Sequence, residues 1–498
     1  MTTEIARFQN LKNRLTVAAG VVLFLLGVWH FGFPPYTIKD TQQAAAAKTA
    51  APDAGEAAGG RMIITHNNGA PEDDKKRQTE QDLMRSLFEK ACPDATLKYS
   101  TWQFSPDTFF AKYIAGTLPD VIGVFATEAA IVIDRGMAAD ITAEMKLWKL
   151  YPHLIPRMID LITRGGRIFG MPAGGDSGFY VMTLFYNKDI LSAAGLTGAD
   201  GNVIPPNTWD DFTTYALKLT DRRVGRAGFG ILGETAGSGW HFLNWVWQAG
   251  GEIMRRRPDG SWESCFHEPG AVRALQFIKD LRWKHDVLQR NVISNNDDLY
   301  ELFSSGRIAM SMHAPDNLNY ITYKFNMPAE RIGICLLPAG PAGRANQIGG
   351  AFILLNPQIK GARRQRAFDS LTFGLDPAVI DQKLQLLRQQ GRPVGIPVIP
   401  IFKPEYQDKI NAIVNKHRNM PDYTALMREA AEVAHAEPPC RCQALYSQYL
   451  GPCVQEVLVN RNADPAALLG EASARFQERE LDPINRELKE AVRQRGTR

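Results

Sequence analysis

The residues that decide the fold lie between positions 183 and 221, where TLFYNKDILSAAGL (183–196) is followed after a short loop by PPNTWDDFTTYALKLTD (205–221). The first stretch continues an apolar run that begins at Phe179 and is typical of a buried strand. In the second stretch, Thr208 can cap a helix, because Asp211 follows three residues later. One face of that helix is then apolar, formed by Phe212, Tyr215, Ala216 and Leu219. A buried strand followed by amphipathic helices predicts an α/β domain.

The same alternation continues along the chain from Arg61 onward. Short apolar runs predict strands at 62–65, 119–125, 307–312, 331–337 and 351–355. A second helical stripe consists of Ala271, Ala274, Leu275, Ile278 and Leu281. We expect both helical stripes to pack in a hydrophobic core and to carry no chemistry.

Composition limits the class of protein. The chain has 498 residues, of which 45% are hydrophobic and 22% are charged, so it can bury two or three ordinary cores. Lys and Arg number 57 and Asp and Glu 53, which leaves a formal net charge of +4. The sequence contains no block of Lys and Arg residues of the kind that binds a phosphate backbone, which argues against nucleic acid as a partner.

The N-terminal segment predicts a location at a membrane. Residues 15–33 (LTVAAGVVLFLLGVWHFGF) contain no Lys, Arg, Asp or Glu. As a helix they would span roughly 28 Å, against about 30 Å for the hydrocarbon core of a bilayer. Three basic residues precede the run, Arg7, Lys12 and Arg14, and they favour a cytoplasmic N-terminus with an exported body.

We therefore expect a cytoplasmic segment at 1–14, a transmembrane anchor or uncleaved signal at 15–33 and a flexible tether at 34–60. The body would then lie on the periplasmic or extracytoplasmic face of the inner membrane. A cleaved signal peptide is the alternative, although its apolar region is usually only about 7 to 15 residues long. No cysteine precedes Cys92, which excludes a lipid-modified cysteine at the end of this segment.

The segment Gly175-Asp176-Ser177-Gly178 matches the residues that surround the nucleophile of chymotrypsin-like serine proteases. Such a nucleophile requires a histidine base, a carboxylate that orients it and an oxyanion hole. The only similar base segment, VAHA at 433–436, lies on the wrong side of the serine in chain order, and no G-x-S-x-G elbow is present. We therefore interpret the segment as a turn into a buried strand. The alternative from another class is an envelope hydrolase that uses Ser177 or the His/Glu pairs.

Several motifs in sequence order resemble the family 1 extracellular solute-binding proteins, the sugar-binding partners of ABC importers. The YNKD…AGL and P-x-T-W segments quoted above are similar to the most recognisable part of that family. RIFGMP (167–172), LFSSGRIAM (302–310), GGAFIL (349–354) and GRPVGIP (391–397) are similar to its other motifs. In place of the Glu that the family has after its Thr-Trp, this chain has Asp211.

This resemblance implies a type II periplasmic-binding-protein fold with two α/β lobes joined by hinge crossings. Lobe 1 would comprise 61–175 with 351–375, and lobe 2 would comprise 176–350 with 376–498. The ligand would lie in the cleft between the lobes, and closure around it would be a hinge motion. The implied function is an extracytoplasmic receptor that delivers a carbohydrate or sugar derivative to the transmembrane subunits of an ABC permease, without catalytic residues, cofactor or metal.

A sugar offers hydroxyl groups and flat C–H faces, so its receptor needs polar groups and aromatic rings. Trp240, which follows Gly237 and Gly239 ahead of an expected helix, is the best stacking candidate, whereas Trp245 and Trp247 are expected in the core. The full set of candidate ligand-binding residues is His66, Asn67, Asn68, Thr127, Glu128, Tyr180, Ser238, Trp240, His313, Asp316, Gly350, Tyr446 and Tyr449.

Two departures from the family leave the ligand open. Relatives often have a tryptophan near Asp316, and this chain does not, which argues against maltodextrins. The anchor is also unusual, since related receptors are commonly free or lipidated. A receptor for another polar solute, such as a polyamine, metal chelate or phosphorylated polyol, and a sensor beside a membrane kinase are the alternatives.

The cysteine pattern is compatible with export. Cys440, Cys442 and Cys453 form the only cluster among six cysteines. A disulfide from Cys453 to either of the other two is favoured over zinc, because this spacing is irregular for a zinc site even with His435 as a fourth ligand.

Overall fold

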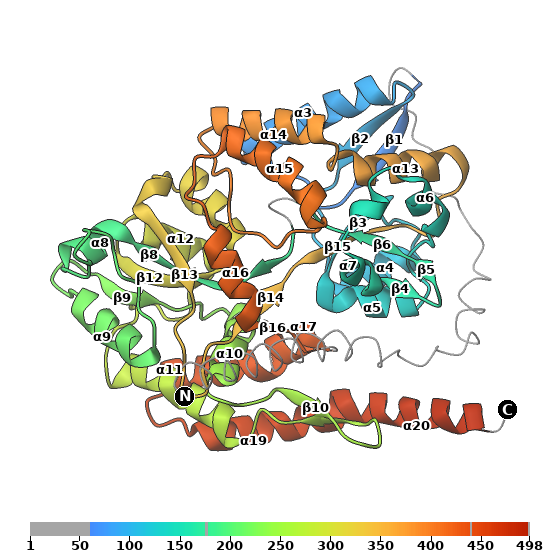
Figure 1. Cartoon of the computed structure of the whole chain (residues 1–498). Coiled ribbons are helices and arrows are strands. Elements are labelled where there is room, and N and C mark those ends of the chain that lie inside the picture. Colours follow the sequence, from blue (N-terminus) through green and yellow to red (C-terminus); the bar gives the residue numbers. More distant parts are fainter. Residues whose placement is uncertain (1–59, 175–177, 439–440, 497–498) are drawn as a thin grey trace, which may run out of the picture. The chain divides into compact units, whose positions relative to one another are not determined.

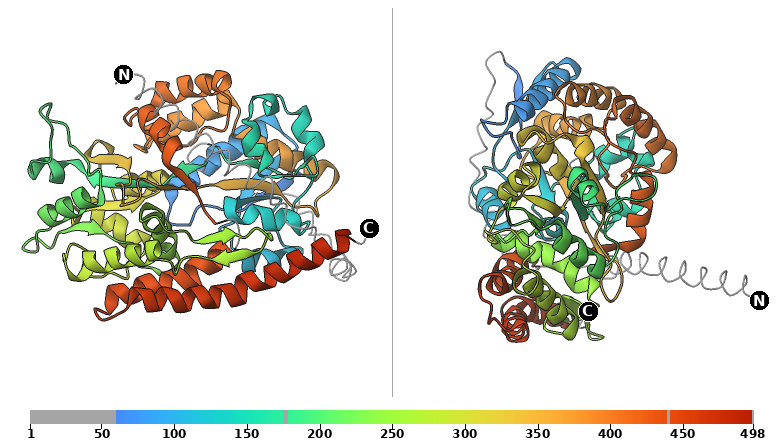
Figure 2. Two further views of the ribbon diagram at one scale, coloured as in Figure 1. Left: turned by 60° about the horizontal axis from the view of Figure 1, so that its bottom comes forward. Right: turned by 90° about the vertical axis from the view of Figure 1, so that its left-hand side faces the viewer.

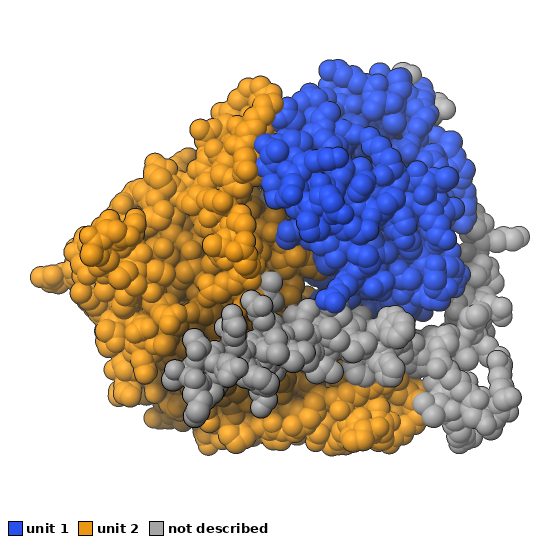
Figure 3. Space-filling model, in the orientation of Figure 1, with its two compact units in different colours: residues 1–174, 350–383, 400–413 blue, residues 175–349, 384–399, 414–498 orange. Residues whose placement is uncertain are grey.

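The computed structural model describes residues 60–174, 178–438 and 441–496 and divides the chain into two compact units (Figures 1 and 3). Within the described residues, unit 1 comprises 60–174, 350–383 and 400–413. Unit 2 comprises 178–349, 384–399 and 414–496. The chain therefore passes from one unit to the other at 174/175 and 349/350, and again at 383/384, 399/400 and 413/414.

Unit 1 is built on a five-stranded sheet with the order β2-β1-β3-β15-β6. The strands are β1 (Met62–His66), β2 (Ala95–Tyr99), β3 (Val121–Phe125), β6 (Gly170–Pro172) and β15 (Ala351–Leu355). β1 pairs in parallel with β2 and β3, whereas β15 is antiparallel to both β3 and β6. Parallel neighbours need crossover connections, and helices supply them here. Ile64, Val124 and Phe352 are buried in the sheet.

Helices and short turns complete unit 1. They are α3 (Lys75–Ala91), α4 (Pro106–Ile114), α5 (Ala126–Asp134), α6 (Thr142–Leu147), η1 (Tyr151–His153), α7 (Pro156–Asp160) and α13 (Gly361–Phe373), and both α14 (Pro377–Gln389) and α15 (Pro404–His417) begin in this unit. A small hairpin pairs β4 (Thr163–Arg164) with β5 (Arg167–Ile168). The side chain of Ser105 accepts a hydrogen bond from the backbone of Thr108, and Pro106 occupies the first turn of α4, which is why this helix begins there.

Unit 2 contains a four-stranded sheet with the order β13-β8-β12-β9 and a three-stranded sheet with the order β16-β14-β7. The first consists of β8 (Thr183–Asn187), β9 (Ala227–Gly230), β12 (Ile308–His313) and β13 (Ile332–Leu336), and the second of β7 (Tyr180–Val181), β14 (Asn346–Gly349) and β16 (Ala434–Ala436). Every residue of β8 and of β12 is buried, as expected for strands covered on both faces.

The remaining elements of unit 2 are mostly helical. They are α8 (Lys188–Ala193), α9 (Trp209–Leu219), α10 (Thr235–Gln248), α11 (Pro269–Trp283), α12 (Asn296–Ser304), η3 (Pro315–Asn317), η4 (Tyr320–Lys324), η5 (Ala329–Arg331), α16 (Thr424–Val433), α17 (Cys442–Ala444), η6 (Leu445–Leu450), α18 (Gly451–Val459), α19 (Pro465–Phe476), η7 (Gln477–Leu481) and α20 (Asp482–Gly496). A hairpin of β10 (Met254–Arg256) and β11 (Trp262–Ser264) lies along the C-terminal helices (Figure 2). Trp262 and Asn485 exchange two hydrogen bonds there.

The local predictions for the 183–221 region are confirmed. Thr208 and Asp211 form a reciprocal capping box at the start of α9, and three of the four expected face residues, Phe212, Ala216 and Leu219, are buried. Trp245 and Trp247 are also buried, as expected for core residues. The ring of Trp245 packs edge-on against Phe229 and, at 5.6 Å, against Trp209.

Two predicted boundaries differ from the structure. We expected residues 376–498 to belong to the second lobe, yet 376–383 and 400–413 belong to unit 1. Contacts within unit 1 explain this: Lys383 forms an ion pair of 3.0 Å with Glu80, and Ile155 donates a backbone hydrogen bond to Ile401. We also expected helix α10 to begin after Trp240, but it begins at Thr235, so the Gly-Ser-Gly-Trp segment forms its first turns.

The predicted disulfide from Cys453 is not formed. Cys453 is a free thiol whose Sγ lies 3.2 Å from the carbonyl oxygen of Tyr449 and 3.6 Å from that of Leu468, so it faces the packing between α18 and α19. Cys440 lies outside the described residues, as do Ser177 and the predicted anchor at 15–33. Among the residues that are described, no helix is long and apolar enough to cross a membrane.

Candidate functional site

Two glycines in unit 2 allow an unusually close contact between backbones. A Cβ atom at Gly239 of α10 would lie 2.3 Å from the carbonyl oxygen of Tyr446, and one at Gly451 would lie 1.9 Å from the carbonyl oxygen of Thr235. Only glycine fits at either position, since real Cβ atoms do not approach backbone this closely. The contact brings the first turns of α10 against η6 and the start of α18, and with them the neighbouring Trp240 and Tyr446.

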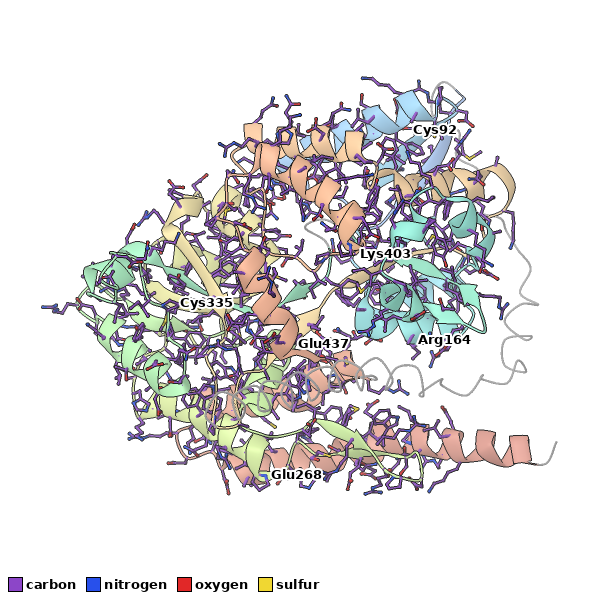
Figure 4. All side chains as sticks on the ribbon, in the orientation of Figure 1. Cys92, Arg164, Glu268, Cys335, Lys403 and Glu437 are labelled. Atoms are coloured by element: carbon purple, nitrogen blue, oxygen red, sulfur yellow. The ribbon has the colours of Figure 1, made fainter. Side chains whose placement is uncertain are left out.

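The carboxylate of Glu437 lies at the centre of these elements, just past β16 (Figure 4). Its Oε1 accepts hydrogen bonds from Trp240 Nε1 at 2.8 Å and from Gln347 Nε2 at 2.7 Å. Its Oε2 accepts a hydrogen bond from the hydroxyl of Tyr446 at 3.1 Å. We call Tyr180, Trp240, Gln347, Glu437 and Tyr446 the Glu437 cluster. The three residues that donate hydrogen bonds to Glu437 come from three separate segments of the chain, α10, β14 and η6.

Asn244 fixes the direction of the Gln347 amide. The Nδ2 of Asn244 donates to Gln347 Oε1 at 3.0 Å, and the backbone N–H of Gln347 donates to Asn244 Oδ1 at 2.8 Å. With its oxygen occupied in this way, the Gln347 amide presents its nitrogen to Glu437. Both amide side chains are fully buried, so this orientation is set by the fold.

Tyr180 of β7 supplies a second aromatic wall. Its ring lies 6.5 Å from that of Trp240 in an edge-on arrangement, and it covers Gly349, where a Cβ atom would lie 2.5 Å from the tyrosine hydroxyl. Both Tyr180 and Trp240 are half-buried, as is Glu437. Burial, together with the charges of Asp316 and Glu437, raises the pKa of the Tyr180 hydroxyl well above its ordinary value.

Burial determines the protonation of the groups around the cluster. It raises the pKa of the Glu437 carboxyl, while the hydrogen bonds from Trp240, Gln347 and Tyr446 act in the opposite direction. Burial lowers the pKa of His241 to about 3, and burial with nearby His241 lowers the pKa of His313 to about 3. These two imidazoles are therefore neutral at neutral pH.

The other candidate residues of unit 2 have different surroundings. Ser238 is buried and its hydroxyl donates to the carbonyl of Thr235. His313 is buried at the end of β12 against Phe185, and neither of its ring nitrogens has a hydrogen-bond partner within the described residues. Asp316 lies in the short turn η3. Tyr449 packs edge-on against Phe476, and its hydroxyl donates to Glu480.

In unit 1 the candidates lie at the ends of β1 and β3. The Nε2 of His66 lies 3.0 Å from the hydroxyl of Ser370, and burial lowers the pKa of this histidine to about 4. The buried Asn67 joins the two strands by exchanging two hydrogen bonds with the backbone of Gly123. Asn68 is exposed and has a φ of 60°. Thr127 and Glu128 lie in the first turn of α5. The backbone carbonyl of Gly350 accepts a hydrogen bond from the backbone N–H of Ala126.

His66, Ser370 and Asp120 do not form a hydrolytic triad. The carboxylate of Asp120 accepts two hydrogen bonds from Arg363 and two from Thr65, and it makes none with His66. The hydroxyl of Ser370 donates to the backbone carbonyl of Ala367. Among the described residues, no group of three or more His, Cys, Asp or Glu side chains could hold a metal ion.

Residues 71–358, more than half of the chain, match the family model of bacterial extracellular solute-binding proteins. The chain belongs to this family. The predicted family resemblance is therefore confirmed, as is the two-lobed α/β fold that it implies. A relative from Deinococcus radiodurans, named "Probable ABC transporter-binding protein", is 26% identical over 214 residues, which is 42% of this chain. The match spans 48% of that relative, about half of its length.

Solved structures of solute-binding proteins share the fold. An ABC transporter solute-binding protein from Thermotoga lettingae, bound with α-D-tagatose, has 21% sequence identity and a TM-score of 0.65, and the match covers 86% of this chain and 98% of that protein. Maltose-bound MalE3 of T. maritima has 22% identity and a TM-score of 0.64, with 84% of this chain and 99% of that protein covered. These likenesses establish the fold of the two units.

Sequence reasoning missed Glu437, Gln347 and Asn244. Glu437 precedes two prolines, a pattern that is typical of an acidic residue in a loop, and Gln347 lies in a stretch that contains no recognisable motif. Two of the residues that donate to Glu437 are far away in the chain: Gln347 by 90 positions and Trp240 by 197. No local spacing signals such contacts, and only the family's general need for polar groups beside aromatic rings pointed in this direction.

Proposed function

We propose that this member of the extracellular solute-binding protein family is the receptor of an ABC importer for a carbohydrate or a closely related polyol. The Glu437 cluster would supply the ligand contacts of unit 2. The receptor would act outside the cytoplasm and would release its ligand unaltered to the transmembrane subunits of a permease.

The observation that carries this proposal is the combination of a carboxylate with half-buried aromatic rings. A carboxylate has about four acceptor sites, of which three are used by Trp240, Gln347 and Tyr446. One site is left for a donor from outside the cluster. Tyr180 and Trp240 lie beside it and offer the flat faces on which the C–H surface of a sugar ring packs.

The test is a thermal-shift screen of the full-length protein against monosaccharides, oligosaccharides and polyols. A ligand present at about 100 times its dissociation constant adds roughly 2.7 kcal/mol to the free energy of unfolding. We expect at least one compound to raise the melting temperature in a saturable way and to be recovered chemically unchanged. If none does so, the proposed function is wrong.

Trp240→Ala should remove most of the ligand-induced shift, because it deletes both a ring face and a hydrogen bond to Glu437. Trp283→Ala is the matched control. Trp283 is also half-buried in unit 2 and donates one hydrogen bond, from Nε1 to the carbonyl of Val457 at 2.8 Å, but it is not part of the cluster. Equal loss of the shift in both variants would show that Trp240 acts only through folding.

A further inference from the structure

All the hydrogen-bond donors that bind the Glu437 carboxylate are neutral groups. The three groups that bind it are an indole N–H, a primary amide and a phenol hydroxyl. Within the described ranges, no Lys or Arg side chain is close enough to stabilise its ionised form. Burial raises the pKa of this carboxyl, so its ionised form would be stabilised by a positive charge, which these neutral donors do not supply.

The nearby bases do not supply the missing charge. His241 and His313 are buried, and burial lowers the pKa of each to about 3. His435 stacks on Trp247 at 4.0 Å, and burial lowers its pKa as well. All three imidazoles are therefore neutral at pH 7, and a second carboxylate, Asp316, adds negative potential at Tyr180.

The aromatic walls are suited to a cation. Rings of Tyr180 and Trp240 meet edge-on beside the carboxylate, so a group placed against either ring also lies near Glu437. The faces of Trp and Tyr attract ammonium groups through the negative potential of the ring face. No Lys or Arg side chain of the described residues occupies either face.

We propose that the Glu437 cluster binds the protonated amine of an amine-bearing carbohydrate. This inference rests on the proposed function and narrows its ligand class. An ammonium group supplies N–H donors for the remaining acceptor site of Glu437, places its charge against the carboxylate and lies over an aromatic face. A neutral hydroxyl would use the acceptor site but would supply no positive charge to stabilise the ionised carboxyl.

The experiment is calorimetric titration of the full-length protein with three matched disaccharides. The chitosan dimer, N,N′-diacetylchitobiose and cellobiose share one β-1,4 backbone and differ at C2, which carries an amine, an acetamide or a hydroxyl. We expect the chitosan dimer to bind at least tenfold more tightly than cellobiose at pH 6, a difference of about 1.4 kcal/mol. The acetamide should resemble cellobiose, because it carries no charge.

Two variants identify the residue responsible. Glu437→Gln keeps the shape and removes the charge, so the ratio of the affinities for the chitosan dimer and cellobiose should fall to less than twofold, although loss of one acceptor site weakens the binding of both. Glu432→Gln, at an exposed position near the end of α16, is the matched control and should keep the full preference. Unaltered melting curves of the unliganded variants would show that both are folded.

The outcomes separate the two proposals. If cellobiose or the acetamide binds as well as the amine, the inference is overturned and the receptor function stands. An amine preference that survives in a folded Glu437→Gln variant also overturns it. If none of the three binds while another neutral sugar in the wider screen does, only the inference is wrong; if no carbohydrate binds at all, both are wrong.

Discussion

Substituting Gly239 by alanine tests whether the backbone contact between α10 and η6 builds the Glu437 cluster. The new Cβ would lie 2.3 Å from the carbonyl oxygen of Tyr446 and 2.9 Å from the backbone nitrogen of Gly451. Ordinary contacts of this kind are 3.4 to 4 Å, so the two segments must separate by about 1 Å. Because both contacts are with backbone, no side-chain rotation can relieve them.

Two opposing terms set the magnitude. Alanine is favoured over glycine inside a helix by about 1 kcal/mol. Overpacking a well-packed core costs about 1 to 3 kcal/mol. We therefore expect Gly239→Ala to leave the free energy of unfolding unchanged or to lower it by up to about 2 kcal/mol, although the substitution alone favours helix.

Gly470→Ala is the matched control. Gly470 lies within helix α19 of the same unit, and a Cβ atom there would meet nothing within 4 Å. It should therefore raise the free energy of unfolding by about 1 kcal/mol, since only the helix propensity changes. Urea denaturation of the two variants should differ by roughly 1 to 3 kcal/mol. Equal stabilisation of both would refute the close contact.

The same variant reports on the site. The clashing carbonyl belongs to Tyr446, whose hydroxyl donates to Glu437 at 3.1 Å. A displacement of about 1 Å would break a hydrogen bond of that length. Gly239→Ala should therefore weaken ligand binding as well, whereas Gly470→Ala should leave it unchanged. Full ligand affinity in a destabilised Gly239→Ala would show that Glu437 does not depend on this contact.

Two further predictions concern stability. Asp120→Asn should lower the free energy of unfolding by about 3 kcal/mol, because it leaves the guanidinium of Arg363 without its charged partner. The control is the exposed Asp297→Asn, which loses only a surface ion pair and should lower the free energy of unfolding by under about 1 kcal/mol. Urea denaturation measures both. Burial lowers the pKa of His313 to about 3, so below pH 6.5 the unfolded chain binds a proton that the folded chain does not. The stability that neutral His313 contributes is complete at pH 7 and falls by about 2 kcal/mol by pH 5. His313→Gln should remove that part of the pH dependence of the free energy of unfolding. If the slope of this free energy against pH is the same in the variant, the folded imidazole is not neutral.

Predictions that depend on local periodicity agree with the structure. The strand predicted at 351–355 is β15, and Thr208 and Asp211 form the expected capping box. Such features are set by residues two to four positions apart, which a single sequence displays directly. Long-range features do not have this property. The return of 400–413 to unit 1 depends on contacts such as Ile155 with Ile401, which no pattern in either segment indicates.

The candidate site shows the same limit. Trp240, Tyr180 and Tyr446 were proposed by residue type and by their place in the family pattern, and the structure gathers them around one carboxylate. Glu437 itself was not proposed. Its partners come from α10, β14 and η6, so its importance follows from three tertiary contacts at once. A loop acid followed by prolines gives no such indication in the sequence alone.

The placement of helix α10 explains why two neighbouring candidates have different surroundings. We proposed Ser238 and Trp240 as ligand contacts in a glycine-containing segment that was expected to lie ahead of the helix. In a helix each residue turns by about 100°, so residues two positions apart point in nearly opposite directions. Ser238 accordingly faces the interior and bonds its own helix, while Trp240 turns toward Glu437. Gly239 lets the backbone of this helix meet the backbone of η6 and α18, and this contact holds the first turns of α10, which carry Trp240, against Tyr446.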